Sequence, residues 1–365
     1  MFMWNLILAF IGIIGLTAVI YVARRIHRFS FIKRFGEKHG FLAWVVSFLA
    51  VAAVGLFALI NLYVVVIVLL HLLFAFLLCD FVGFIVRKAA KRSFGYDVQN
   101  IAALLLAAVY LGAGWFLAHH VFETDYTFYT DKAVGDGFRI VEIADAHIGI
   151  TLDGADFAAQ MERVQQTRPD AVVIVGDFVD DDTEKEDMLA ACQALGKLET
   201  TYGVYFVFGN HDNGYFNYRN FTAAELRGAL ENNGVTILED ESVLLDDSFY
   251  LVGRRDRSSP GRASAGDLTE GLDTSKYIIV LDHQPNDYAN EAASGADLVL
   301  SGHTHGGHIF PAGLVGLATG ANDRTYGTEV RGGTTFVVTS GISGWGIPFK
   351  TGAISEFVVI DVYSE

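Results

Sequence analysis

The sequence predicts an apolar helical module over the first third of the chain, followed by a layered α/β domain. Long uncharged runs occupy much of residues 1–120, whereas after about residue 137 short β-branched runs alternate with amphipathic helical segments. Charge divides the 365-residue chain at the same place. Residues 1–120 hold ten Lys or Arg and three Asp or Glu, and the remainder holds 16 and 39. The two regions are therefore expected to occupy different environments.

The apolar runs are predicted to cross a membrane four times, because each matches the ~20 residues that a helix needs to span a bilayer. Residues 41–86 would measure roughly 69 Å as one helix, far more than a hydrocarbon core of ~30 Å. We therefore expect a turn near Asn61. The predicted spans are about residues 4–23, 41–60, 64–86 and 101–119.

Two alternatives compete with this interpretation of the apolar third. A cleaved signal peptide would account for the first run, but that run has no basic leader and is followed directly by Arg24-Arg25. A soluble helical bundle would show polar stripes along its helices, and these runs do not. Retained membrane spans explain the pattern better.

The basic residues predict the orientation of the spans. Six lie between residues 24 and 38 and four between residues 87 and 92. The positive-inside rule puts both loops in the cytoplasm, so both termini and the acidic domain are expected outside it. If residues 41–86 were one span plus a re-entrant segment, the domain would lie inside. Within the spans, His71 and Asp80 mark either a functional path or contacts between helices.

Composition limits what the acidic domain can bind. Its 16 basic and 39 acidic residues give a balance of −23, which repels nucleic-acid phosphates, so no nucleic-acid partner is expected. The chain has two cysteines, Cys79 and Cys192, which cannot build a disulfide framework or a thiolate zinc site. Any metal must therefore be held by His, Asp, Glu or Asn.

The domain is predicted over residues 137–365, after a linker at 121–136 that is rich in Thr, Tyr and Asp. Helices are expected between the early strands, for example at the capping box Thr222-x-x-Glu225. The later strands follow one another with few helices, which favours a β-sandwich flanked by helices. The strand candidates are residues 138–144, 171–175, 204–208, 243–252, 277–281, 298–300, 335–339 and 356–362.

Five predicted strands are followed by motifs that contain His, Asp or Asn. Ligands bind beyond the carboxyl ends of strands in layered α/β sheets, and residues two apart in an extended chain project to the same face. Each motif alone can be a surface turn or a satisfied core residue, but together they predict one rim of metal ligands. The motifs are Ala144-Asp145-Ala146-His147, Gly176-Asp177-Phe178-Val179-Asp180, Gly209-Asn210-His211-Asp212, Asp282-His283-Gln284-Pro285 and Gly302-His303-Thr304-His305-Gly306-Gly307.

The donor types in these motifs predict the kind of metal and its chemistry. Nitrogen and oxygen ligands without thiolate suit Mn²⁺, Fe or Zn²⁺. A carboxylate has two oxygens and can bridge two cations. Two ions ~3.5–4 Å apart clamp the attacking and leaving oxygens of an in-line displacement and generate hydroxide at neutral pH. We therefore expect two divalent transition-metal ions.

In these motifs, residues 137–365 resemble the calcineurin-like metallophosphoesterases, and most of all the membrane-attached bacterial branch. The resemblance implies a four-layered α/β/β/α sandwich that hydrolyses phosphodiesters or phosphomonoesters by attack of metal-bound hydroxide. It also implies that Asp177 bridges the two metals and that His211, oriented by Asp180, protonates the leaving oxygen. Asp212 is a second candidate to orient His211. The other implied ligands are Asp145, His147 and His305 for one metal, and Asn210, His283 and His303 for the other.

Three positions depart from the usual pattern of that family. Ala146 stands where a bulkier apolar residue is usual, and His308 follows the double glycine where Gln is frequent. Lys350, in the Gly/Pro loop 344–350, stands where Arg is expected. On the resemblance, His308 and Lys350 are the residues expected to contact the phosphate of the substrate.

Two other classes of function compete with a membrane-anchored hydrolase. A non-catalytic sensor or binding protein built on such a domain would be expected to have lost a ligand, yet every position is filled. A transporter or channel would show charged or broken spans. For a hydrolase at the outer face, suitable substrates are a phosphorylated lipid, a lipid-linked sugar phosphate or a cell-wall phosphodiester, with membrane lipids as further partners.

Overall fold

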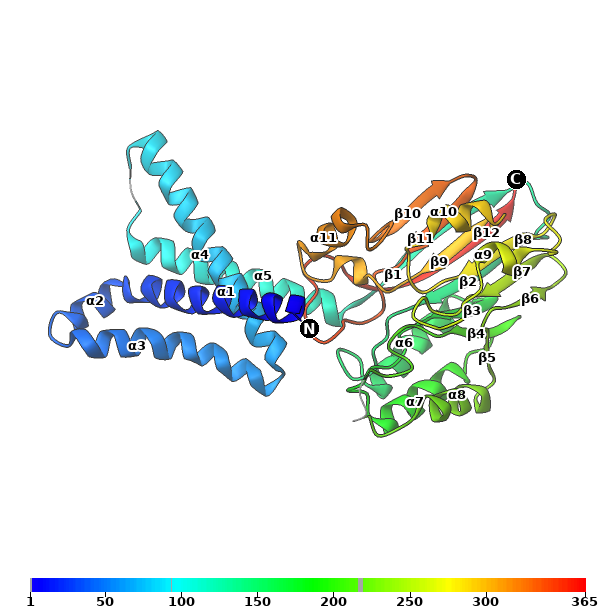
Figure 1. Ribbon diagram of the computed structural model, residues 1–365, viewed down its shortest axis with the longest axis horizontal. Helices are drawn as coiled ribbons and strands as arrows, with labels where there is room; N and C mark the ends of the chain where they lie inside the picture. The colour runs from blue at the N-terminus through cyan, green and yellow to red at the C-terminus, as the bar shows by residue number, and fades with distance from the viewer. Residues whose placement is uncertain (1, 93, 216–218) are drawn as a thin grey trace. The chain divides into compact units, whose positions relative to one another are not determined.

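The computed structural model describes residues 2–92, 94–215 and 219–365. The chain forms two compact units, Met1–Gly114 and Trp115–Glu365, each with its own set of internal contacts. Figure 1 shows that the first unit is helical and that the second contains two β-sheets with flanking helices.

The first unit contains three helical stretches, among the described residues, that are long and apolar enough to cross a membrane: Gly40–Leu59, Leu62–Ala90 and Tyr96–His119. The predicted span at 4–23 falls in the first helix, but the side chains up to residue 11 lie outside the described part of the chain. A fourth span therefore stays a prediction. The helices are α1 (Phe2–His27), α2 (Ser30–Gly36), α3 (Gly40–Ala52), the 3₁₀ helix η1 (Ala53–Leu59), α4 (Leu62–Ala90) and α5 (Tyr96–His119).

Asn61 divides the long apolar run at the place where the sequence predicts a turn. Its side-chain oxygen accepts a hydrogen bond from the backbone N–H of Val64 at 2.9 Å, so Asn61 caps the start of α4. A cap of this kind satisfies a donor that the first helical turn otherwise leaves unpaired.

The polar residues within the apolar helices have partners. Arg25 is 1% exposed, and its Nη1 lies 3.0 Å from Asp80 Oδ1. The Tyr21 hydroxyl donates a further hydrogen bond to the same carboxylate. His71 Nδ1 lies 2.8 Å from the carbonyl of Ile67 in its own helix. These contacts are the ones that helix packing requires of buried polar groups in a membrane.

The second unit contains two six-stranded mixed sheets. In the central strands β3 and β8 every residue is buried, as expected of parallel strands that are covered on both faces. In spatial order, the first sheet consists of β1 (Val121–Thr130), β12 (Ser355–Ser364), β2 (Phe138–Ile143), β3 (Ala171–Val175), β4 (Gly203–Val207) and β5 (Val235–Ile237). The second consists of β10 (Gly327–Arg331), β11 (Thr334–Val338), β9 (Leu298–Ser301), β8 (Tyr277–Leu281), β7 (Phe249–Gly253) and β6 (Glu241–Leu245).

The layers of this unit follow the order helix, sheet, sheet, helix (Figure 1). An apolar core fills the space between the sheets, where residues such as Val173 of the first sheet and Ile279 of the second lie buried. On the outer face of the first sheet pack α6 (Gly154–Gln166), α7 (Lys185–Leu195) and α8 (Ala223–Asn232). On that of the second sheet pack α9 (Ala265–Thr269) and α10 (Tyr288–Ala293).

The prediction of a linker over residues 121–136 was wrong, because most of it is strand β1. This edge strand pairs in parallel with β12, from Val121 opposite Ser355 to Thr130 opposite Ser364. Its Phe, Tyr and Thr residues favour extended backbone, and their burial alternates because one face packs on the core. A single residue, His120, separates β1 from the end of α5.

Residues 243–252, predicted as one strand, belong to a hairpin of two strands. Asp246 and Asp247 adopt positive φ angles of 49° and 51°. Tight hairpin turns require such angles, and Asp tolerates them better than most residues do. The chain reverses there, so that β6 pairs antiparallel with β7. The prediction failed because an Asp-Asp pair was not recognised as a turn.

A buried ionic cluster lies beyond the ends of β7 and β8. Arg254 is 4% exposed, and its guanidinium contacts Asp282 at 2.9 Å and Asp287 at 2.7 Å. Glu291 lies 3.4 Å from the same guanidinium, and Arg262 is a second cation on Asp282. Burial raises the pKa of Glu291 well above its ordinary value. We call these five residues the arginine cluster.

Candidate metal centre

The polar motifs converge at one edge of the second unit, where β2, β3, β4, β8 and β9 end. Three groups of side chains each have ligand atoms within 4.8 Å of one another. Segments far apart in the sequence thus deliver their side chains to one place, as the strand-end pattern predicts. The groups are Asp145, His147 and His305; His147, Asp180 and His211; and Asp177, His283 and His303.

The backbone is strained at these positions. Asp145, His147, Asp177, His303 and His305 have positive φ angles between 36° and 68°. A non-glycine residue in this conformation costs on the order of 1–3 kcal/mol, and such residues gather at active sites and ligand sites. Five of them at one edge indicate that the fold holds these side chains for function.

Two motif glycines allow the segments to approach one another. A Cβ atom at Gly302 would lie 2.6 Å from Ala144 Cβ and 2.9 Å from Asp145 Oδ2. A Cβ atom at Gly209 would overlap the carboxylate of Asp177. Only residues without a side chain fit there, which explains why the polar motifs carry glycine next to their ligands.

Asp177, a member of the group with His283 and His303, also faces His147 of the first group. Its Oδ2 is 3.0 Å from Nε2 of His283 and 3.7 Å from Nε2 of His147. Its other oxygen, Oδ1, accepts a hydrogen bond from the backbone N–H of His211 at 2.8 Å. Burial opposes ionisation of Asp177, but the neighbouring imidazoles hold its pKa well below the ordinary value. One ionised carboxylate therefore faces ligands of both groups, which is the arrangement that a bridging ligand requires.

The residues at this edge fit divalent metal ions. Asp145 Oδ2 and His303 Nδ1 are buried, and among the described residues neither atom has a hydrogen-bond partner. An unpaired buried polar atom costs about 1–3 kcal/mol, a cost that coordination of a cation removes. Asn210 belongs to none of the three groups; its side-chain amide is bonded to Tyr215 and its Oδ1 lies 3.4 Å from Gln284 Nε2. These carboxylates, imidazoles and amide are the donors that Mn²⁺, Fe and Zn²⁺ accept.

Asp180 holds two imidazoles. Its Oδ1 lies 3.0 Å from Nδ1 of His211 and its Oδ2 lies 3.3 Å from Nδ1 of His147. Burial disfavours the charged form of Asp180, but the neighbouring imidazoles of His147 and His211 keep its pKa below the ordinary value. His211 is 13% exposed at its side chain. Its pKa is raised, because the bond to Asp180 and the charge of Asp177 outweigh its burial. His211 is thus oriented and able to carry a proton.

Asp212, the second candidate to orient His211, has a different position. Its carboxylate accepts four backbone N–H bonds, from Asp177, Phe178, Val179 and Gly209, at 2.7–3.1 Å. Burial, with the charge of Asp177, raises its pKa to about 6. Asp212 therefore joins the loops after β3 and β4 and leaves the orientation of His211 to Asp180.

Sequence reasoning missed Asp256, which lies at the same edge. Asp256 is 1% exposed, and its Oδ2 accepts a hydrogen bond from Gln284 Nε2 at 2.8 Å. Gln284 in turn approaches Asn210, so Asp256 positions a residue next to a candidate ligand. A turn at residues 246–248 makes 249–253 a separate strand. Asp256 then follows the end of a strand, as the other motifs do, and this is the signal that could have identified it.

Lys350 does not contact the pocket, contrary to the expectation for a residue that binds substrate phosphate. It is fully buried, and its three N–H bonds go to the carbonyl oxygens of Ser340, Gly341 and Ile354 at 2.7–3.0 Å. Burial lowers its pKa to about 7. Lys350 therefore ties the backbone before the Gly/Pro loop, at Ser340 and Gly341, to the backbone after it, at Ile354.

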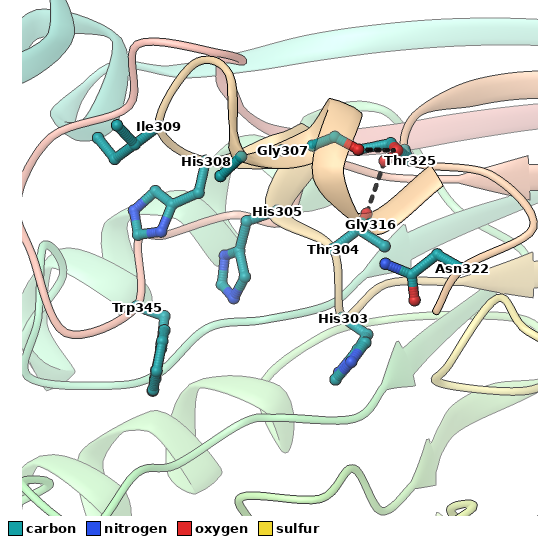
Figure 2. Close-up of a pocket in the computed structure, with 12 residues that line it drawn as sticks. His303, Thr304, His305, Gly307, His308, Ile309, Gly316, Asn322, Thr325 and Trp345 are labelled. Atoms are coloured by element: carbon teal, nitrogen blue, oxygen red, sulfur yellow. Dashed lines mark hydrogen bonds between the residues drawn. The ribbon is translucent and has the colours of Figure 1, made fainter. Parts of the chain in front are cut away.

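A pocket of about 310 Å³ opens beside the candidate ligands His303 and His305. Figure 2 shows His303, His305, His308 and Trp345 around it. The ring of His308 lies 5.2 Å from that of His305 and close to parallel with it. The expected contact of His308 with substrate is compatible with this place and stays a prediction.

Comparisons with known proteins agree with this site. The family model for calcineurin-like phosphoesterases matches residues 138–307. An uncharacterized metallophosphoesterase of Campylobacter jejuni is 30% identical over 370 residues, which cover 96% of each chain. One of Helicobacter pylori strain J99 is 31% identical over 77% of this chain and 80% of that protein.

These matches include a relative aligned with nearly the whole chain, so the chain belongs to the calcineurin-like phosphoesterase family. A transmembrane protein with a metallophosphoesterase domain from Danio rerio is 32% identical over 62% of this chain and 53% of that protein. The resemblance seen in the strand-end motifs is thereby confirmed. The family accounts for divalent metal as cofactor and phosphate ester as substrate class.

Proposed function

We propose that the chain is a membrane-anchored phosphoesterase that hydrolyses phosphate esters with two divalent transition-metal ions. The observation that carries the proposal is the carboxylate of Asp177, which faces His147 on one side and His283 on the other. When bound, the ions would supply Lewis acidity toward the phosphoryl oxygens and lower the pKa of the attacking water. One ion would be held by Asp145, His147 and His305, and the other by Asn210, His283 and His303, with Asp177 between them.

The residues that are not ligands have separate parts. Asp180 bonds Nδ1 of His211, which leaves Nε2 on the opposite side of the ring to donate a proton. As the ester bond breaks, His211 would protonate the leaving oxygen, the help expected of an oriented general acid. Asp212 keeps the loops that carry Asp177 and Asn210 together.

Metal analysis of the full chain in detergent tests the proposal when it is joined to two assays. Bis(p-nitrophenyl) phosphate reports diester hydrolysis and p-nitrophenyl phosphate reports monoester hydrolysis. We expect about two ions per chain, since one carboxylate can bridge two, and turnover of at least one ester. Bound metal without any turnover would favour the alternative, a non-catalytic sensor or binding protein. Absence of stoichiometric metal would contradict the mechanism.

We further propose that the catalytic domain faces outward, because the basic residues gather in two loops. A membrane-impermeant thiol reagent should label Lys33→Cys only after cells are broken, since Lys33 lies in a basic loop. The control is Arg257→Cys, an exposed position in the second unit, which should be labelled in intact cells. The opposite pattern would place the domain in the cytoplasm.

A further inference from the structure

An exposed apolar helix follows the metal-ligand loop. Helix α11 (Ala312–Thr319) begins seven positions after His305, and every residue in it is at least partly exposed. Phe310 is 57% exposed, Leu314 59%, Val315 59% and Leu317 44%. Large apolar side chains on soluble surfaces occur mostly singly, and a contiguous group marks an interaction site. We call these four residues the apolar rim.

The apolar rim is continuous with the candidate metal centre. Ala312, Gly313 and Gly316 of α11 line the same pocket as His303 and His305. Figure 2 shows Gly316 and the two histidines around it. A second pocket, of about 170 Å³, lies against α11 and is lined by Phe310, Leu314 and Leu317 of the rim, among others. Gly307, Gly313 and Thr325 border both pockets. A ligand with a polar and an apolar part can therefore contact the metal ligands and the rim at once.

The second unit also shows where its membrane connection lies. The last turn of α5, from Trp115, belongs to this unit. The carbonyl of the buried residue Ala118 accepts a hydrogen bond from Ser355 Oγ at 2.9 Å. The next residue, Glu356, donates its backbone N–H to Gly341 at 3.0 Å, and Gly341 abuts Asp145. The chain therefore enters the second unit at the same edge that carries the candidate metal ligands.

The charge of the rim suits a bilayer. The domain as a whole is strongly acidic, yet residues 305–320 contain no Asp, Glu, Lys or Arg. An acidic surface repels anionic lipid headgroups, whereas an uncharged apolar segment gains free energy by burial among acyl chains. Trp345, 48% exposed beside the first pocket, is a residue type enriched at membrane interfaces.

We propose that the apolar rim inserts into the lipid interface and that the metal centre takes its phosphate ester from a membrane lipid. The substrate class rests on the proposed phosphoesterase function, whereas the insertion does not. In the reaction, the oxygen of water forms a bond to phosphorus and the ester P–O bond breaks. The leaving oxygen takes a proton from His211, and the proton lost by water passes to solvent. A soluble substrate would make no use of the rim.

Insertion is tested with the full chain in phosphatidylcholine vesicles, on a background in which Cys79→Ser and Cys192→Ala remove the native thiols. An environment-sensitive fluorophore on Leu314→Cys should be quenched by spin-labelled lipid and protected from aqueous iodide. The control is Val330→Cys, which is 67% exposed in β10. Val330 pairs with Thr335 at the opposite end of the sheet, so its label should be quenched by iodide. Iodide quenching at both positions would overturn the insertion.

The substrate source is tested by competition against turnover of bis(p-nitrophenyl) phosphate. Phosphatidic acid in vesicles should inhibit at much lower concentration than soluble glycerol 3-phosphate. The double variant Leu314→Ser, Leu317→Ser should weaken the lipid competition about tenfold or more, since two large apolar side chains lose their burial, while Val330→Ser should not. Equal inhibition by both competitors would overturn the lipid source. Absence of turnover in the unmodified chain would instead overturn the proposed function and leave the fluorescence result standing.

Discussion

Two buried acidic clusters of the second unit differ in how their charge is balanced. In the arginine cluster, Arg254 and Arg262 lie against Asp282, Asp287 and Glu291, so the chain itself supplies the cations. At the candidate metal centre the carboxylates face imidazoles, and Asp145 keeps a buried oxygen without a hydrogen bond among the described residues. A buried charge needs a partner. Both clusters keep buried oxygens without a hydrogen bond among the described residues, such as Asp282 Oδ1 in the first. The first cluster has guanidinium cations of its own, whereas the ion pairs of Asp177 and Asp180 are with imidazoles, so the second calls for cations from outside.

Asp177→Asn should have the largest effect, because Asp177 is the carboxylate that faces both His147 and His283, candidate ligands of the two proposed metals. We expect loss of bound metal and a decrease in turnover above about 10⁴-fold, since metal-dependent stabilisation of the transition state is lost. Elemental analysis and ester hydrolysis measure the two effects. Asp287→Asn, in the arginine cluster, is the matched control and should keep its metal. Equal metal loss in both variants would contradict the view that the candidate metal centre, and not the arginine cluster, holds the cations.

His211→Ala should keep the metal and lose turnover by about 10²–10⁴-fold, the usual contribution of a general acid. The loss should shrink for esters with good leaving groups, which need no proton. Asp180→Asn should cause a smaller loss of turnover of the same kind. Combining it with His211→Ala should lower turnover little further, because the two residues act as one pair. A loss that is the same for every leaving group would argue against a proton donor.

Arg254→Met should leave the metal content of the folded protein unchanged and destabilise the second unit. Removing one partner from a buried ionic cluster costs about 3–5 kcal/mol, since the remaining charges stay buried. The urea midpoint of the tertiary fluorescence signal measures this change. Arg255→Met is the control next in sequence, because Arg255 is 42% exposed and lies 3.8 Å from Asp240. If Arg254→Met left the urea midpoint unchanged, the arginine cluster would not need that cation for stability.

The smallest effect is expected at an ion pair near the surface. Arg139 forms two hydrogen bonds with Asp361, at 2.7 and 2.8 Å, and its side chain is 37% exposed. Asp361→Asn should destabilise the fold by less than about 1 kcal/mol, because solvent screens the pair, and added salt should reduce the difference. If Asp361→Asn destabilised the fold as much as Arg254→Met, burial would not explain why some ionic contacts stabilise the protein more than others.

The sequence was most informative where a pattern has one structural solution. Buried parallel strands such as residues 171–175 and 277–281 are continuous apolar runs, and the motifs after them lie together because such strands end at one edge. The Asp180–His211 contact was expected from the resemblance and is present at 3.0 Å. The roles of these residues as ligands and proton donor stay predictions.

The failures concern positions where tertiary contacts decide. Strand β1 was predicted as a linker because its sequence is rich in polar residues, which an edge strand tolerates. Its partner β12 lies far along the chain, so the local sequence does not reveal the pairing. Lys350 was expected to bind phosphate because its charge is normally exposed. Three backbone carbonyls on either side of its loop, those of Ser340, Gly341 and Ile354, satisfy it instead. Neither outcome has a signal in the local sequence.

A single residue, His120, lies between helix α5 and strand β1, and this bears on the proposed lipid substrate. A domain on a long flexible tether samples a volume of solution, and its effective concentration at any surface falls with tether length. The chain has no long tether between α5 and β1, since His120 alone separates them and β1 is paired along its length with β12. With the membrane lipid proposed above as substrate, encounters would be limited by diffusion of that lipid within the plane of the membrane. Turnover would then depend on surface density in the bilayer rather than on concentration in bulk solution.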